Sequence, residues 1–293
     1  MGIDRNAARY LAYVRRRGVD FARTATLGRQ GLHLSARQLH GAAQRQRLAL
    51  DDTTLASIFL EAGGYAEPFL RLLGAHEVDS FDVSAYEGAT HLHDFNAPLP
   101  DEYKNRYTVV FDGGSLEHVF NVPVALRSAM EMVTVGGHFL AYTPANNLFG
   151  HGFYQFSPEL FFRVFTPENG YAVEEVVLCV DSRLARWRAV ADPAEVRSRV
   201  TLVNRAPTYL FVRARRVAAV APLARPPQQD DYAAAWDRGQ GESPEVGAAS
   251  RRYGGGPLGA LHEQLLAPVG RRLRRWLTPR YRPDHFRPLD DAR

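Results

Sequence analysis

Apolar and polar residues follow two different periods along the chain, and the two periods predict helices and strands. Apolar residues recur at helical spacing over residues 4–17, 35–47, 51–63, 66–73, 123–133, 159–165 and 258–277. Short apolar runs typical of strands cover residues 19–27, 77–83, 90–93, 107–111, 138–143, 171–180 and 208–215. Several of these runs end at an acidic residue or a glycine, and Gly136-Gly137 is expected to form a turn before the run at 138–143.

Alternation of strands with helices predicts an α/β fold with a Rossmann-like, doubly wound sheet. We expect a mostly parallel sheet in which 171–180 and 208–215 form an antiparallel edge hairpin. The predicted organisation is an N-terminal helix (1–18) and a core domain (19–217). A linker or poorly ordered segment (218–256) and a basic C-terminal helix and tail (257–293) follow.

Composition narrows the classes of protein that the chain can belong to. The 293 residues are 45% apolar and 23% charged, which is enough to bury a full core. The single cysteine, Cys179, excludes an internal disulfide and a cysteine-cluster metal site, and its apolar neighbours predict a buried strand thiol. We expect no metal site.

Charge and hydropathy bear on partners and location. The net charge of +4 is modest and its positive excess lies mainly within 251–287, so nucleic acid is not expected as a partner. No apolar run is long enough to span a membrane and no signal segment is evident, which predicts a cytoplasmic protein. The arginines at 271–275, beside a leucine stripe, predict a helix packed on the body or weakly associated with anionic lipid.

The residues with potential chemistry fall where predicted strands end. Ligands of open α/β sheets bind outside the carboxyl ends of the strands. Gly28 follows the first such strand, and a glycine lets the backbone approach a ligand closely. Asp82 lies at the end of the next strand, where a carboxylate can accept hydrogen bonds from both ribose hydroxyls, and Asp112 follows a third.

Three segments carry a resemblance to a known family. They read VVFDGGSLEHV (109–119), SFDVSAYEGAT (80–90) and TPANNLFGHGFYQFSPELFFRVF (143–165). Over about residues 19–217 the chain resembles class I S-adenosylmethionine-dependent methyltransferases, most closely a bacterial subgroup with the YEGAT and GHGFYQFSPELF motifs. The resemblance implies S-adenosylmethionine as cofactor.

The resemblance also implies positions for cofactor-binding residues. Gly28 would border the methionine part, Asp82 would hold the ribose, and Asp94 with Phe95 would lie by the adenine. Asp94 is equally explained as a turn aspartate. Asp112 and Gly113 would close the pocket beneath the sulfonium.

The chain departs from the family at its glycine-rich loop. No GxGxG follows the first predicted strand, where the sequence reads TLGRQ (26–30). An alternative register takes residues 58–60 as the first strand and Gly63-Gly64 as the loop. Gly28 is preferred, because residues 51–64 read more naturally as a capped helix.

Methyl transfer requires a positioned acceptor and, for a hydroxyl or ammonium acceptor, a group that takes a proton. His118 and His151 are the candidate bases because imidazole titrates near neutrality. His151 stands in a loop that follows a core strand. The same loop carries the candidate acceptor-binding residues Asn146, Asn147, Tyr154 and Gln155. The alternative for both histidines is a structural role.

The expected function is methyl transfer to an oxygen or nitrogen of a small-molecule or sugar-like (glycan-type) acceptor. One alternative is a non-catalytic or partner-dependent protein of the same fold, since GxGxG is missing. A nicotinamide-dependent oxidoreductase is a further alternative, disfavoured because no GxGxxG follows any predicted strand. The acceptor and the oligomeric state are left open.

Overall fold

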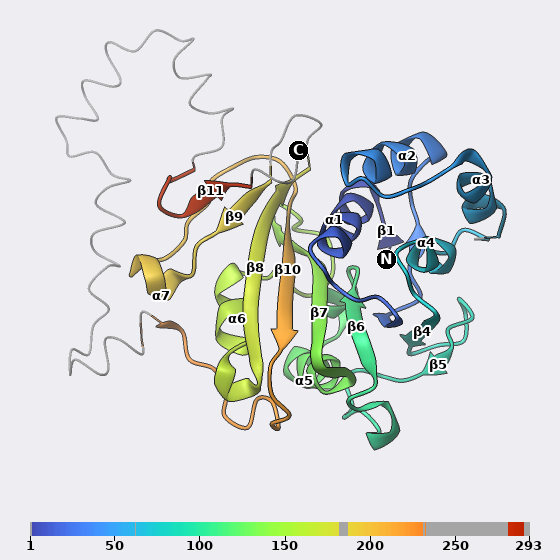
Figure 1. The fold of residues 1–293 in the computed structure, drawn as a ribbon. Coiled ribbons are helices and arrows are strands. Elements are labelled where there is room, and N and C mark those ends of the chain that lie inside the picture. The colour runs from blue at the N-terminus through green and yellow to red at the C-terminus, as the bar shows by residue number, and fades with distance from the viewer. Residues whose placement is uncertain (1, 62, 182–186, 231, 233–280, 290–293) are drawn as a thin grey trace, which may run out of the picture.

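A computed structural model describes residues 2–61, 63–181, 187–230, 232 and 281–289. Its centre is a nine-stranded sheet in the order β11-β9-β8-β10-β7-β6-β2-β4-β5 (Figure 1). Its strands are β2 Arg23–Leu27, β4 Glu77–Asp82, β5 His91–Leu92, β6 Tyr107–Asp112, β7 Val133–Asn146, β8 Tyr171–Val180, β9 Arg188–Val190, β10 Thr208–Arg216 and β11 Phe286–Pro288. Two further strands, β1 Gly2–Ile3 and β3 Gly31–Leu32, pair in parallel outside this sheet.

The sheet confirms the α/β fold but is mixed rather than mostly parallel. β5, β4, β2, β6 and β7 pair in parallel, whereas β10 is antiparallel to both β7 and β8, and β9 is antiparallel to β8 and β11. The predicted antiparallel pair, β8 with β10, therefore forms but is not at the edge. β9 and β11 lie beyond it, and each is too short to stand out in the sequence.

Helices cover both faces of the sheet, as the alternation of strand residues requires. Along β6, Val109 and Phe111 pack with the helices of one face and Val110 with those of the other. The first face carries α1 Arg5–Arg16, α2 Ala36–Arg45, α3 Asp52–Glu61 and α4 Glu67–Leu72. The second carries α5 Val122–Met132 and α6 Pro158–Val164, and a short α7 covers Pro193–Val196.

Local sequence signals account for the helix starts. Ser35 forms a capping box with Gln38 at the start of α2, and the Asp51 carboxylate accepts a hydrogen bond of 2.7 Å from the Thr54 amide ahead of α3. Asp4 caps α1 through the amides of Asn6 and Ala7. Because residues 58–60 lie within α3, the alternative register that made them a strand is wrong.

The expected glycine turn before β7 is wrong, and two C-terminal expectations fall largely outside the described residues. Gly136-Gly137 lie inside β7, which begins at Val133, so they are not a turn preceding the strand. Gly137 has no room for a side chain, since a Cβ there would lie 2.7 Å from the Thr108 carbonyl oxygen of β6. The expected helix at 258–277 and most of the expected linker at 218–256 lie outside the described residues. Within the described residues, no helix is long and apolar enough to cross a membrane.

Candidate functional site

The carboxyl ends of β2, β4 and β6 lie next to one another, because these strands are neighbours and parallel. Gly28 follows β2 with φ +70°, a backbone conformation that favours glycine. Its amide donates to the Phe81 carbonyl at 2.7 Å, which places Gly28 beside Asp82 at the end of β4. Asp82 is half-buried, and its carboxylate accepts a hydrogen bond from the Ser84 amide at 3.1 Å.

A buried glutamine holds the loop after β2. The side-chain amide of Gln30 donates to the Leu27 carbonyl at 2.6 Å, and its exposed fraction is 2%. A Cβ on Gly113 would lie 2.2 Å from Oε1 of Gln30, so a side chain at this position after β6 would displace Gln30. The Ser115 hydroxyl also donates to the Leu27 carbonyl. These contacts join the ends of β2 and β6, and neither Gln30 nor Ser115 was expected from the sequence.

Asp94 and Phe95 lie after β5. The Asp94 carboxylate is exposed and accepts hydrogen bonds from the main-chain and side-chain nitrogens of Asn96, at 2.9 and 2.8 Å. These bonds lower the pKa of Asp94. Phe95 is buried in the core, 6.4 Å between ring centroids from Phe81. The turn explanation of Asp94 is therefore directly visible, and contact with adenine stays a prediction for both residues.

Two buried carboxylates follow β6. Asp112 is fully buried, and its Oδ1 accepts hydrogen bonds from the Ser115 and Leu116 amides at 2.8 and 3.2 Å. Glu117 is 1% exposed. Burial raises the pKa of Asp112 well above its usual range, with a further contribution from the charge of Glu117. Burial likewise raises the pKa of Glu117 to about 7.

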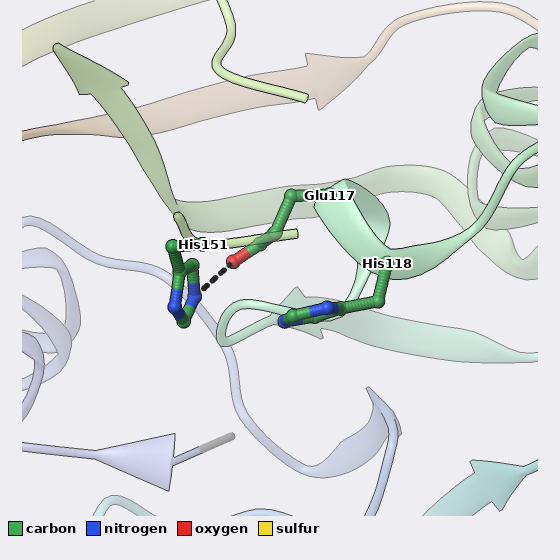
Figure 2. Close-up of side chains that lie close together, drawn as sticks. All are labelled: Glu117, His118 and His151. Atoms are coloured by element: carbon green, nitrogen blue, oxygen red, sulfur yellow. Dashed lines mark ion pairs between the residues drawn. The ribbon is translucent and has the colours of Figure 1, made fainter. Parts of the chain in front are cut away.

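The Glu117 carboxylate points toward His151, and His118 lies nearby (Figure 2). Nε2 of His151 lies 3.4 Å from Oε1 of Glu117, and the rings of His118 and His151 are 5.0 Å apart between centroids. Burial, and then the neighbouring His151, lower the pKa of His118. The structure thus brings together two histidines predicted from the sequence. It adds Glu117, for which the sequence signal was its place before His118 in the motif.

The same three side chains have the donor types that divalent metal ions bind. One ligand atom from each of Glu117, His118 and His151 lies within 4.8 Å of the others. Imidazole nitrogen with carboxylate oxygen suits zinc and other transition metals. The arrangement supports either proton transfer between His151 and Glu117 or capture of such an ion.

The loop after β7 is held by its own polar side chains. The Asn147 side chain, from a residue with φ +60°, donates to the Ala206 carbonyl at 2.9 Å, and that of Asn146 donates to the Asn204 side chain at 3.0 Å. Gln155 Oε1 accepts from the Leu148 amide at 2.9 Å. The Tyr154 hydroxyl donates to the Phe120 carbonyl at 2.8 Å. These hydrogen bonds give each of the four polar side chains a structural role within the protein. Their part in binding a methyl acceptor therefore stays a prediction.

Exposed aromatic rings lie on this loop and beside it. Phe149 is 100% exposed, Phe153 67% and Phe120 72%. The rings of Phe120 and Phe153 meet edge to face at 5.9 Å between centroids. Phe156, by contrast, is buried in the core. Exposed aromatic rings next to a polar cluster are typical of ligand-binding surfaces, and no sequence pattern separated them from core aromatics.

No protein-family model and no curated protein sequence matches this chain. Solved structures with some likeness include a putative methyltransferase from Bacillus halodurans C-125, with 13% identity and a TM-score of 0.38, covering 73% of this chain and 100% of that one. A putative sarcosine dimethylglycine methyltransferase from Galdieria sulphuraria has 11% identity and a TM-score of 0.40, covering 72% and 85%. A geranyl diphosphate methyltransferase in complex with SAM has 14% identity and a TM-score of 0.38, covering 73% and 85%. TM-scores below 0.5 at such identities do not establish a shared activity.

Proposed function

We propose that this chain is an S-adenosylmethionine-dependent methyltransferase acting on an oxygen or nitrogen of a small-molecule or sugar-like acceptor. The observation that carries the proposal is the placement of Gly28, Asp82 and Asp112 at the carboxyl ends of three adjacent parallel strands. Ligands of open α/β sheets bind at this edge. The motifs at 80–90, 109–119 and 143–165, which carry the family resemblance, adjoin the same edge.

The residues at this edge fit the cofactor by their chemistry. Asp82 is a half-buried carboxylate beside a main-chain turn, and it would accept the two ribose hydroxyls. Gly28 leaves room beside the turn for the methionine part. Asp112 and Gly113 would line the pocket from the end of β6, while Asp94 and Phe95 would lie by the adenine. The cofactor supplies an electrophilic methyl group to the acceptor.

His151 would take the proton from the acceptor, and Glu117 would receive it from His151. Burial brings the pKa of Glu117 to about 7. Nε2 of His151 lies 3.4 Å from this carboxylate, so a proton that His151 takes from the acceptor would have a nearby group to receive it. A proton-transfer group whose pKa lies near the working pH is the most effective in general acid–base catalysis. His118, on the other side of the cluster, would orient His151.

The loop at 146–157 would form the acceptor wall. His151 reaches Glu117 from this loop, so the loop lies beside the end of β6. Its exposed rings, Phe149 and Phe153, would pack on an apolar or ring-shaped face of the acceptor. Side chains of Asn146, Asn147, Tyr154 and Gln155 would contribute any hydrogen bonds to it.

Calorimetric titration of the full chain tests the proposal. Three ligands are compared: S-adenosylmethionine, S-adenosylhomocysteine and NAD. We expect saturable binding of the first two and none of NAD. Binding of none of the three would support a non-catalytic or partner-dependent protein, and binding of NAD alone would support a nicotinamide-dependent oxidoreductase.

A further inference from the structure

A cavity of about 180 Å³ lies between helices α1 and α2 on the face of the sheet opposite α5 and α6. Figure 1 shows these two helices next to each other. Arginine side chains from both helices line it: Arg5 and Arg9 come from α1, and Arg37 and Arg45 from α2. Its remaining wall includes Asn6, Gln38, Val180 and Trp187.

No acidic side chain lines this cavity, and in the described part of the chain none of its four guanidinium groups forms an ion pair. Arginines elsewhere in the described structure do pair with carboxylates. Arg29 pairs with Glu67 at 2.7 Å, and Arg163 pairs with Asp192. The arginines of the cavity therefore concentrate positive charge that described residues do not compensate.

Arg9 shows the cost of this concentration most clearly. Its guanidinium lies over the Trp187 ring at 4.4 Å from the centroid, and its Nε is buried without a hydrogen-bond partner in the described residues. Burial, and then the positive charge of Arg45, lower the pKa of Arg9. A buried donor without a partner and like charges held together both destabilise a fold. An anion in the cavity would relieve both effects.

We propose that this cavity binds the phosphate or diphosphate group of a small molecule. Planar guanidinium groups bind phosphate oxygens through paired hydrogen bonds, and several together balance its charge of roughly −1.5 to −2 better than they would a carboxylate. A cavity of about 180 Å³ has room for a phosphoryl group. The rest of the ligand would extend into solvent.

The shape of the charge distribution favours a small ligand. Nucleic-acid sites carry basic groups along an extended groove that follows the backbone, whereas these four arginines converge on one hollow between two helices. Val180, at the end of β8, lies at its wall, so the cavity is beside the sheet but distinct from the Glu117 cluster. The inference does not depend on the proposed methyl transfer.

Calorimetric titration of the full chain with inorganic diphosphate at constant ionic strength tests this site. We expect saturable binding that weakens at least tenfold in Arg45→Gln and in Arg9→Gln. Arg71→Gln is the matched control, because Arg71 is an exposed arginine on α4 and not part of the cavity. It removes the same charge and should leave affinity unchanged.

Thermal unfolding without diphosphate verifies that each variant is folded. Arg45 is exposed, so Arg45→Gln keeps the test valid if Arg9→Gln does not fold. Failure of the wild-type chain to bind diphosphate would overturn the proposal. An equal loss in Arg71→Gln would also overturn it, because binding would then reflect overall charge.

Two further arms separate other occupants. Leu289 donates its amide to the Trp187 carbonyl at 3.3 Å, and Asp290 and Asp291 follow it in the sequence. If diphosphate binds only after Asp290→Asn with Asp291→Asn, the cavity serves the chain's own carboxylates and the proposal is wrong. Sedimentation with phosphatidic-acid vesicles that depends on Arg45 and is not displaced by diphosphate would assign the arginines to a lipid surface instead.

Discussion

Nε2 of His151 lies 3.4 Å from Oε1 of Glu117, a carboxylate that is 1% exposed. The two residues are 34 positions apart, and β6 and β7 bring them to the same edge of the sheet. This pairing places an exposed imidazole against a buried acid in the proposed acceptor site.

Replacing His151 by alanine should leave cofactor binding intact and slow turnover. Loss of a general base typically lowers the rate about 10²- to 10⁴-fold. Calorimetry with S-adenosylhomocysteine and single-turnover rates with an identified acceptor measure the two effects. His76→Ala, an exposed histidine away from the cluster, is the control. A normal rate in His151→Ala would remove His151 from the mechanism.

Chelation and zinc addition distinguish a base from a metal ligand. If His151 takes the proton, EDTA should leave turnover unchanged. Added Zn²⁺ should inhibit, because Glu117, His118 and His151 offer three suitable donor atoms within 4.8 Å and capture would block Nε2. Activity that disappears with EDTA and returns with a divalent ion would contradict the base role.

Asp82→Ala should weaken S-adenosylhomocysteine binding by about 1.5 to 3 kcal/mol, the range for hydrogen bonds to a charged group. The reason is the loss of a carboxylate that would accept hydrogen bonds from two ribose hydroxyls. Calorimetry gives the difference directly. Asp101→Ala, which removes an exposed carboxylate paired only with Lys104 at 2.9 Å among the described residues, should bind normally. Equal affinity in the two variants would refute the assignment of Asp82.

Gly28→Val should abolish cofactor binding, whereas Gly63→Ala should affect only stability. Both glycines have positive φ, +70° and +49°, so both substitutions strain the backbone. Gly63→Val is therefore the matched control for strain, since nothing lies within 4 Å of its Cβ position. Binding is measured by calorimetry on variants shown by thermal unfolding to be folded. Retained binding in folded Gly28→Val would exclude Gly28 from the pocket.

Glu175 should make stability depend on pH. Burial raises its pKa above the ordinary value of 4.5, so the folded chain holds this proton to higher pH than the unfolded chain. The free energy of unfolding should therefore fall as pH rises from 4.5 to the higher pKa of the folded state. Glu175→Gln, which keeps an oxygen acceptor for the Tyr13 hydroxyl, should flatten this fall.

Urea unfolding at a series of pH values measures the difference between Glu175→Gln and the wild-type chain. Glu102→Gln, an exposed position, should follow the wild-type curve. A slope unchanged in Glu175→Gln would show that its carboxyl does not control the pH dependence.

Local signals were sufficient for most elements of the fold. Ser35 and Asp51 mark helix starts by capping, and β-rich runs ending at Asp82 and Asp112 mark the central strands. Such signals act over a few residues, so a sequence displays them directly. The same reasoning identified His151 and His118 as candidates from their loops.

Pairing over long distances was decided only by the tertiary structure. β9 and β11 are three residues long and are held in the sheet by hydrogen bonds to distant strands, so no local pattern in the sequence predicted them. Without them, β8 and β10 were expected at the edge of the sheet. Burial of Glu117 against His151, and of Gln30 against Gly113, likewise depends on packing between segments far apart in the chain. The sequence by itself determined which residues could do chemistry at the strand ends. Only the folded sheet decided which of them meet, because contact and burial are properties of the assembled core.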